Sequence, residues 1–396
     1  MTLSRSTSLF AQCLQVFSRR DFEHAVRLHQ AERYAKGFSS WDQFTAMLFS
    51  HLAQAQSLRE ICGGLACCVG KVQHLGLRKA PSRSTLSYAN AHRPWPLYQT
   101  VLTQLVATCH GVTRGKTKFR FRNKLFSMDA TLIDLSLTVF GSWAKYRFTK
   151  GAAKLHTVLD HEGYLPVFAT LTPGHVHDTR IARTLTFPPG SIVVFDRGYN
   201  DFTFFANLDQ HGVYFVTRMK RPTLFRVLDR RTPPHGIRAD QTIQLTGPRA
   251  RHLPPLRRIV YRDPETGRRL VFLTNHFGFG ATTIARIYKD RWQIEIFFKE
   301  LKHTLKIKSF VGTTPNALHI QIWTALIAMV LLRYLQLRAK LKWHLSNLVA
   351  FLRWNLFTYR NLWEWLDDPY QTPPGIPGPI QLYLPLPGIG QHDGGP

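Results

Sequence analysis

The spacing of apolar residues changes along the chain, and each change predicts a different kind of element. In the first part, apolar positions recur at helical spacing, as at Trp41, Phe44, Leu48 and Leu52. Residues at this spacing lie on one face of a helix. We therefore expect a helical N-terminal domain over residues 1–110.

Polar residues beside these segments predict where the helices begin. Ser39 or Ser40 can cap one helix, and Ser57 with Glu60 forms a capping box for the next. Ser82 opens a third, short helix of small, polar and basic residues. Three such helices fit a helix-turn-helix-like DNA reader, but they also fit any small helical bundle.

A strand pattern replaces the helical one after the N-terminal domain. Residues 125–139 are rich in Leu, Ile and Thr, and residues 153–160 and 164–172 flank a turn typical of a hairpin. Residues 191–195 form a short apolar run typical of a strand buried on both faces. Together with a short helix before the last strand, these segments predict an α/β fold over residues 119–204.

The rest of the chain divides into four segments. Residues 205–280 are strand-like and interrupted by Pro and Gly, which predicts a β-strand insertion. Residues 281–345 are helical, and residues 281–308 contain no Gly or Pro, so a single helix is expected there. Residues 346–370 predict a C-terminal helix. Residues 371–396 are rich in Pro and Gly and are expected to be disordered.

One face of the helix predicted over residues 281–308 carries an unusual set of side chains. At about 100° per residue, the arc of about 60° includes Tyr288, Arg291, Glu295 and Lys302. The apolar residues run beside this arc rather than through it. A carboxylate between two cations and a phenol suits a face that meets metal ions and phosphates. The simpler alternative is that Glu295 is the (i, i+4) partner of Arg291 or Lys299 on a solvent-exposed face.

The net charge indicates the kind of partner. The chain has 52 Lys and Arg against 24 Asp and Glu, a formal net charge of +28. This excess points to a polyanion, and first to nucleic acid; a merely soluble cationic protein is the alternative. Five Cys without regular pair spacing argue against a disulfide framework and a zinc finger. The apolar run over residues 320–332 is too short to span a bilayer, so we expect a cytoplasmic protein without a membrane partner.

Three acidic residues lie where the predicted elements can bring them together. Asp129 lies in the first strand, Asp196 follows the buried strand, and Glu295 lies on the helix. Carboxylate oxygens are the ligands that Mg²⁺ and Mn²⁺ prefer, and two such ions promote phosphodiester chemistry. Asp134 lies on the opposite face of the strand from Asp129, so it is a poorer candidate. Glu300 is also poorer, because it points about 140° away around the helix.

Two other features have simpler explanations. His175, His177 and Asp178 form a possible metal cluster, but Asp178 or Thr179 is better explained as the cap of a short helix. Trp292 lies beside the polar helix face, and we expect it to pack in the core.

With these motifs the chain resembles the DDE transposases of bacterial insertion sequences, of insertion-sequence family four. The family signature, Tyr-x2-Arg-x3-Glu-x6-Lys, matches the four residues of the polar helix face. The motifs around the two Asp residues are Met128-Asp129-Ala130-Thr131 and Phe195-Asp196-Arg197-Gly198-Tyr199. The resemblance covers about residues 120–365 and includes the β insertion. The helical N-terminus also resembles a domain often attached to this group.

The resemblance implies an RNase H-like catalytic core, interrupted by an all-β insertion and preceded by an α-helical domain. In such a core Asp129, Asp196 and Glu295 hold two Mg²⁺ ions, for which Mn²⁺ substitutes. The resemblance also implies contacts to DNA phosphates, from Tyr288, Arg291, Lys302, Arg197 and Tyr199.

The implied activity is cut-and-paste DNA transposition by a homodimer in a synaptic complex. Such an enzyme binds terminal inverted repeats, cleaves through a hairpin intermediate and joins the ends to double-stranded target DNA. Hairpin-forming relatives hold a flipped base with an aromatic residue of the insertion, often Trp. Residues 201–280 contain no Trp, which leaves Tyr261, Phe272 or Phe277. The alternatives are a metal-dependent nuclease without strand transfer and an inactive DNA-binding copy that acts as a repressor.

Overall fold

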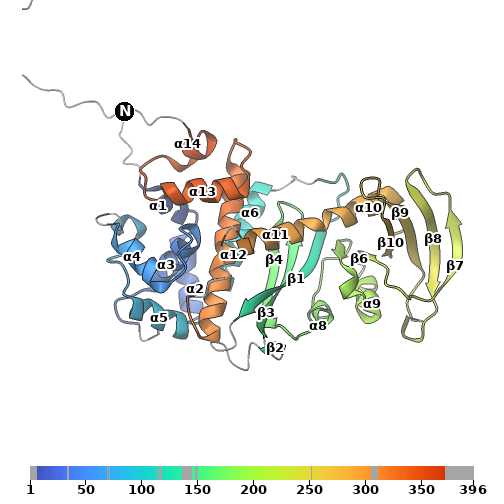
Figure 1. The fold of residues 1–396 in the computed structure, drawn as a ribbon, viewed down its shortest axis with the longest axis horizontal. Helices are drawn as coiled ribbons and strands as arrows, with labels where there is room; N and C mark the ends of the chain where they lie inside the picture. The colour runs from blue at the N-terminus through green and yellow to red at the C-terminus, as the bar shows by residue number, and fades with distance from the viewer. Residues whose placement is uncertain are drawn as a thin grey trace, which may run out of the picture.

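The computed structural model describes residues 7–370 except residues 34, 69, 71, 114, 116–117, 136–144, 148–149, 251, 304 and 306–310. Helices gather at one end of the molecule, and one large sheet extends from them to the other end (Figure 1). The predicted tail over residues 371–396 lies outside the described residues. The fold is mixed α/β, as the sequence predicted.

The N-terminal part is helical, as expected. Its helices are α1 (Leu9–Leu14), α2 (Arg19–Leu28), α3 (Ser40–Leu52), α4 (Leu58–Ala66), α5 (Arg83–His92) and α6 (Pro96–Thr113). Ser39 caps α3 in a reciprocal capping box with Asp42, and the Ser57 and Ser82 side chains cap α4 and α5. These caps satisfy backbone N–H groups that have no partner within the helix.

Five strands form the core of the sheet in the order β4-β3-β1-β5-β6. They are β1 (Leu125–Leu135), β3 (Lys150–Asp160), β4 (Leu165–Pro173), β5 (Ile192–Phe195) and β6 (Tyr214–Arg218), and the short β2 (Lys145–Arg147) pairs with β3. The β1–β3 and β3–β4 pairs are antiparallel, whereas β1–β5 and β5–β6 are parallel. All four residues of β5 are buried, because helices cover both faces of the sheet there. This is the RNase H-like core that the resemblance implied.

Four more strands extend the same sheet. They are β7 (Phe225–Arg231), β8 (Ile237–Leu245), β9 (Leu256–Arg262) and β10 (Arg269–Thr274), and β10 pairs with β6 of the core. The segment assigned to the insertion from the sequence, residues 205–280, therefore also contains one core strand. It includes most of helix α9 (Phe202–Gln210) as well. Whether a strand belongs to the core or to the insertion depends on pairing between distant segments, which a strand pattern alone does not reveal.

The helices after the insertion differ from the prediction in one important place. A single helix was expected over residues 281–308, but α10 (Ala281–Asp290) and α11 (Trp292–His303) meet at Arg291. Around this joint the Arg291 N–H bonds to the Tyr288 carbonyl, and the Ile294 N–H bonds to the Arg291 carbonyl. These are i to i+3 bonds of a tighter turn. The last part of the predicted helix, from residue 306, lies outside the described residues.

The remaining helices are α8 (Asp178–Ala182), α12 (Pro315–Arg338), α13 (Leu345–Asn355) and α14 (Leu362–Asp367). The single C-terminal helix predicted over residues 346–370 is thus wrong, because two helices form there. Helix α12 is long and apolar enough to cross a membrane, but 89% of its most apolar window is buried inside the protein.

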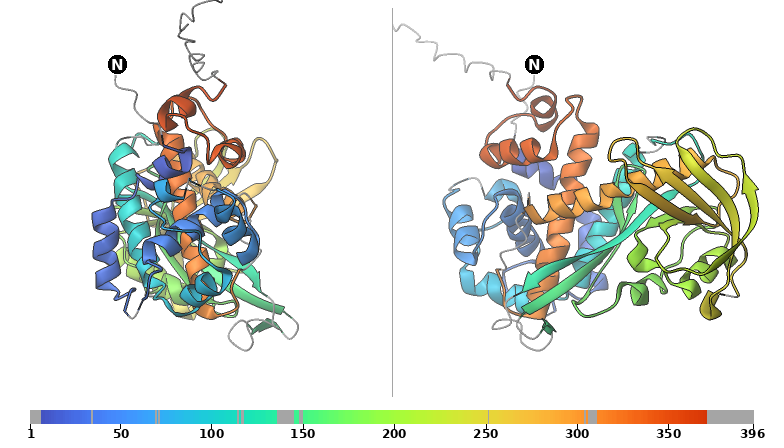
Figure 2. Two further views of the ribbon diagram at one scale, coloured as in Figure 1. Left: turned by 90° about the vertical axis from the view of Figure 1, so that its left-hand side faces the viewer. Right: turned by 45° about the vertical axis from the view of Figure 1, so that its right-hand side comes forward.

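Helix α12 joins the N-terminal helices to the sheet. It lies between those helices and the sheet (Figures 1 and 2) and shares one continuous apolar core with both. The His51 ring of α3 bonds to the Thr324 hydroxyl of α12 at 2.9 Å, and the Asn316 amide donates to the carbonyls of Asn90 and Arg93. The N-terminal helices are therefore part of the folding unit that contains α12.

Candidate active site

Asp129 and Asp196 stand side by side on neighbouring parallel strands. Met128 of β1 pairs with Phe195 of β5, so the next residue on each strand is one of the two acids. The carboxyl ends of parallel strands meet at one edge of a sheet, which brings their side chains together. The Asp196 carboxylate accepts a hydrogen bond of 2.7 Å from the Gly198 N–H, which fixes its orientation.

Glu295 reaches this pair through Arg291. The Arg291 guanidinium donates from Nη2 to Glu295 Oε1 at 2.5 Å, and its Nη1 lies 3.6 Å from Asp129 Oδ2. Its Nε–H is buried and has no hydrogen-bond partner among the described residues. The break between α10 and α11 places this side chain between the strand and the second helix. The structure thus brings three predicted acids and one predicted cation into one cluster.

The environment of Asp129 favours cations. The pKa of its carboxyl is raised to about 7, mainly by burial and also by the nearby Asp196 and Glu295 charges, whereas the Ala130 N–H and Arg291 oppose the rise. Carboxylates that disfavour one another's charge in this way are stabilised by an added positive charge. Their oxygen donors are the kind that Mg²⁺ and Mn²⁺ select. The residues present therefore fit divalent ions.

Tyr288 and Lys302 lie on the same two helices as the cluster. The Tyr288 ring packs on Phe272 at 5.0 Å between centroids, and the Arg291 guanidinium lies 5.5 Å from its ring centroid. Burial raises the pKa of Tyr288, so its hydroxyl remains a hydrogen-bond donor. Lys302 is half-buried near the end of α11, two helical turns after Glu295.

The two residues that follow Asp196 have different surroundings. Arg197 is exposed, but Tyr199 is only 2% exposed. The predicted DNA contact of Tyr199 is therefore wrong for this conformation. Its ring packs against Phe195, and its buried hydroxyl has no hydrogen-bond partner among the described residues. Burial first, and then the charges of Asp129 and two further acids, raise the pKa of Tyr199.

The exposure of four aromatic residues bears on which of them can stack on a base. Trp292 was expected in the core, but it begins α11 and is 58% exposed. Phe272, a candidate from the insertion, is 1% exposed and belongs to the core. Tyr261 and Phe277 are half-buried.

The possible cluster of His175, His177 and Asp178 is explained by local structure. The His177 side chain, and not Asp178 or Thr179, caps α8 by accepting from the Thr179 N–H. Asp178 pairs with Lys154 at 2.9 Å. The prediction that Asp178 or Thr179 is the cap is therefore wrong by one residue.

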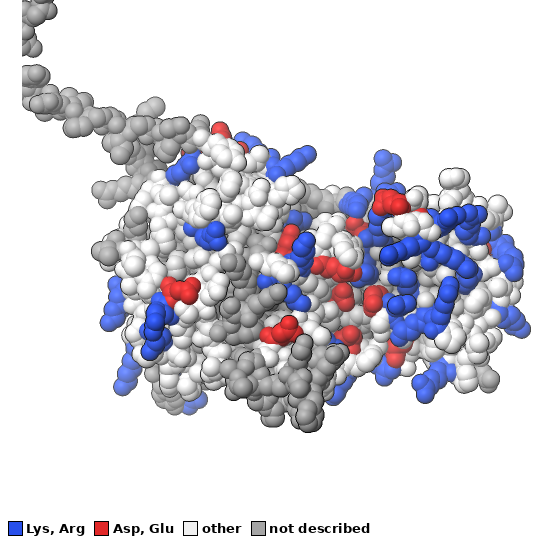
Figure 3. Space-filling view, viewed as in Figure 1, with Lys and Arg blue, Asp and Glu red and all other residues white. Residues whose placement is uncertain are grey.

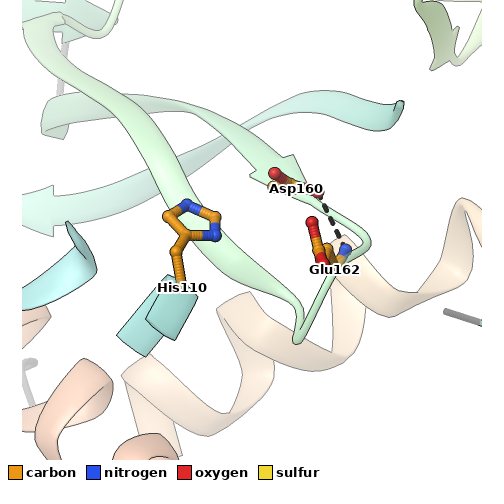
Figure 4. Close-up of side chains that lie close together, drawn as sticks. All are labelled: His110, Asp160 and Glu162. Atoms are coloured by element: carbon orange, nitrogen blue, oxygen red, sulfur yellow. Dashed lines mark hydrogen bonds between the residues drawn. The ribbon is translucent and has the colours of Figure 1, made fainter. Parts of the chain in front are cut away.

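Another group with suitable donors is formed by His110 of α6, Asp160 at the end of β3 and Glu162 in the following turn (Figure 4). In the described part of the chain, this is the group whose ligand atoms all lie within 4.8 Å of one another. Asp160 accepts from the Glu162 N–H, and Glu162 accepts from the Gly115 N–H, each at 2.8 Å. These bonds give both carboxylates a role in shaping the turn, so we assign no ion to them. The sequence did not suggest the group, because His110 comes from a distant helix.

Charge is unevenly distributed around the acids. Figure 3 shows Lys and Arg gathered over the strands of the insertion, beside a group of Asp and Glu in the middle of the molecule. Exposed members of this basic surface on β7, β9 and β10 are Arg226, Arg230, Arg262 and Arg269. A basic surface beside an acidic cluster suits a polyanion that crosses a cation site.

Comparisons with known proteins show the family of the chain. Residues 120–331 match the family described as Transposase DDE domain, and residues 5–78 match a Domain of unknown function (DUF4372). The Sinorhizobium fredii protein y4zB, which bears a transposase name, is 31% identical over 261 residues, or 64% of this chain and 71% of that protein. A Geobacillus stearothermophilus protein named as a transposase for insertion sequence element IS5377 is 30% identical over 278 residues, or 68% of this chain and 72% of that protein. The chain is also similar to the piggyBac transposase in a synaptic complex with hairpin DNA, with a TM-score of 0.44, 10% identity and coverage of 96% and 88%.

Proposed function

Because the chain belongs to the transposases with a DDE domain and is thus an enzyme that acts on DNA, we propose that Asp129, Asp196 and Glu295 are its catalytic carboxylates. The observation that carries this proposal is the cluster itself. Asp129 on β1 lies beside Asp196, which follows β5, and Arg291 links Glu295 to Asp129.

The three carboxylates would hold divalent ions, Mg²⁺ first and Mn²⁺ as a substitute. When bound, such ions activate an attacking oxygen and stabilise the leaving oxygen of a phosphodiester. The protein's own part is to hold the acids in place: β1 and β5 fix the two Asp residues, and α11 fixes Glu295.

The cations of the site would hold the DNA backbone. Arg291 presents a planar, forked guanidinium and Lys302 a point charge, which are the two usual ways to bind a phosphate. Tyr288 can donate its hydroxyl, and the exposed Arg197 lies next to Asp196. Together these groups would position the scissile phosphate against the carboxylates.

The wider activity that we propose is cut-and-paste transposition of an insertion sequence of family four. The enzyme would bind terminal inverted repeats, cut them through a hairpin intermediate and join them to target DNA, acting as a homodimer in the bacterial cytoplasm. The intact signature from Tyr288 to Lys302 supports this proposal.

For DNA recognition we propose the exposed face of α5. Arg83, Ser84, Ser87 and Tyr88 are exposed on this short helix, and polar and aromatic side chains of this kind can reach base edges and phosphates. Substitutions on this face are the suitable test. Deletion of the whole segment would uncover α12 and unfold the protein. Arg83→Ala with Tyr88→Ala should remove discrimination between transposon ends and random DNA while metal-dependent nicking persists.

The domain organisation follows from the same reasoning. We propose an N-terminal DNA-binding unit over residues 1–110 and a catalytic core formed by residues 119–204 and 281–345 together with strand β6. The extra strands β7–β10 would form the functional insertion between the two parts of this core. The helices of residues 346–370 complete the packing around α12.

A pair of matched variants tests the catalytic assignment. Glu295→Gln should reduce nicking of end-containing DNA more than about 100-fold, because a ligand to the ions is lost. Glu300→Gln is the control, since Glu300 lies on the same helix but faces Arg333. Equal loss in both variants, or no loss in either, would contradict the assignment.

Pre-cleaved ends incubated with plasmid separate the remaining alternatives. A transposase gives joined products, whereas a nuclease gives nicks only. An inactive repressor binds the ends without changing them, and Glu295→Gln would then have no effect on any product.

A further inference from the structure

Asp290, the residue before Arg291, is an acid of the site region that the signature does not include. Its side chain is 1% exposed and has three partners. Lys118 Nζ lies 2.5 Å from one carboxylate oxygen, and His161 Nδ1 and Tyr164 Oη lie 2.8 and 3.2 Å from the other. Three donors from two distant segments thus meet at the end of α10.

His161 carries this connection to the strand of the first catalytic acid. Its Nδ1–H donates to Asp290, and its Nε2 hydrogen-bonds with the Ser127 hydroxyl. Ser127 precedes Asp129 by two positions, so both side chains lie on the same face of β1. The His161 N–H also donates to the Leu125 carbonyl of β1 at 3.0 Å.

These contacts connect β1 to the α10–α11 joint by two separate routes, which together form a closed circuit. From β1 the circuit passes through His161 to Asp290, continues along the chain to Arg291, and returns to β1 where Arg291 approaches Asp129. Arg291 stands at the joint between two helices, where the backbone bonds are of the tighter i to i+3 kind. Such a joint can bend, so side-chain contacts decide its direction.

We propose that Asp290 is a positioning residue for Arg291: its ties to Lys118, His161 and Tyr164 hold the α10–α11 joint at the distance from β1 that lets Arg291 bridge Asp129 and Glu295. The inference rests on the proposed function, because it assigns Asp290 a role in DNA cleavage. Asp290 itself touches none of the three catalytic carboxylates.

The test is a double-mutant cycle on the full-length protein. Single-turnover nicking is measured for Asp290→Asn, for Arg291→Ala and for the double variant. We expect Asp290→Asn to slow nicking about 10-fold or more, as loss of a supporting hydrogen bond does at other sites. If Asp290 acts through Arg291, the double variant will be no slower than Arg291→Ala alone. If the loss of nicking in the double variant equals the product of the losses in the two single variants, the inference is overturned.

A matched buried acid separates positioning from general stability. Asp240 is 4% exposed and accepts two hydrogen bonds from Arg257, from Nε at 2.8 Å and Nη2 at 2.6 Å, within the insertion. Asp240→Asn should lower the melting temperature, but its effect on nicking should multiply with that of Arg291→Ala. If the nicking effect of Asp240→Asn also failed to multiply with that of Arg291→Ala, the result for Asp290→Asn would reflect lost stability only. That outcome would overturn the inference.

Two further variants keep the outcome decisive. If Asp290→Asn does not fold, Tyr164→Phe removes one donor and leaves the ring, and it should show a smaller but equally non-additive loss; a multiplied loss would overturn the inference. Glu295→Gln identifies the source of a failure. If it nicks as fast as the wild type, the proposed function is wrong. If it is inactive while Asp290→Asn and the wild type nick equally, only the positioning role of Asp290 is wrong.

Discussion

Arg291 and Glu295 form a hydrogen bond of 2.5 Å across one turn at the start of α11. The same guanidinium approaches Asp129 at 3.6 Å. One cation therefore partly neutralises two acids that belong to different elements. A phosphate that binds to Arg291 would draw the guanidinium away from the acids and leave them free for cations.

Replacement of Arg291 by Lys tests the need for a forked cation. A lysine keeps the charge but cannot reach two partners in one plane. We expect single-turnover nicking to fall about 10- to 100-fold with little change in thermal stability. Arg183→Lys is the control, because Arg183 also makes a two-pronged contact, but with Asp201, which is not one of the proposed catalytic carboxylates. A similar loss in both variants would contradict a special role for Arg291.

Gly198→Ala should damage the site without a large effect on folding. A Cβ at this position would lie 2.7 Å from the Asp196 Oδ1 that the same residue's N–H binds. The carboxylate must turn away, so nicking should fall more than about 10-fold. Gly63→Ala is the matched control, since its Cβ would meet no atom within 4 Å. That variant should be neutral or more stable by up to about 1 kcal/mol, because Ala favours helices. Unchanged nicking by Gly198→Ala would contradict the prediction.

Trp292→Ala should weaken binding of DNA with unpaired bases near the cleavage site. An exposed indole beside Arg291 can stack on a base, and such stacking contributes about 1–3 kcal/mol per base. Binding measured by fluorescence anisotropy should weaken accordingly, while the melting temperature stays the same. Trp354 is 73% exposed on α13, so Trp354→Ala is the control and should bind normally. Equal affinity of both variants would argue that Trp292 does not meet DNA.

The free energy of unfolding should fall as the pH is lowered from about 6.5 to about 4, because His51 stays neutral in the folded protein over this range. Burial lowers the pKa of His51 to about 4, although a bond with the Gln321 backbone opposes this. The unfolded chain takes up the proton near pH 6.5 and the folded chain only near pH 4. The contribution is therefore complete above about pH 6.5 and is lost toward pH 4, up to about 3 kcal/mol.

Denaturant unfolding at several pH values measures this effect. His51→Asn removes the titrating group, so its free energy of unfolding should depend less on pH between 6.5 and 4 than that of the wild type. His156, whose pKa burial also lowers to about 4, remains in the variant and accounts for a residual slope. Parallel pH profiles of variant and wild type would contradict the prediction.

DNA affinity should fall steeply with salt concentration. The excess of cations, many of them on the insertion strands, implies release of counterions from the DNA on binding. Filter binding between about 50 and 200 mM salt should show a loss of about 10³-fold if some six phosphates are contacted. A flat dependence would contradict a backbone-binding role for the basic surface.

Local patterns in the sequence predicted most of the elements and singled out the candidate residues of the site. The hairpin of β3 and β4, the caps at Ser57 and Ser82, and the acids on β1, after β5 and on α11 follow from local rules of spacing and hydrogen bonding. Predictions failed where a distant partner decides the outcome. No Gly or Pro marks the break at Arg291. Trp292 was expected in the core but is exposed, whereas Tyr199 was expected to contact DNA but is buried.

The sequence by itself determined which groups are candidates for the chemistry, because residue type and spacing fix what a side chain can do and on which face of an element it lies. The tertiary structure decided how these groups meet. It set the parallel pairing of β1 with β5, the inclusion of β6 in the core, and the link from Ser127 through His161 to Asp290. These relationships join segments far apart in the chain, and they depend on packing and burial that no local pattern records.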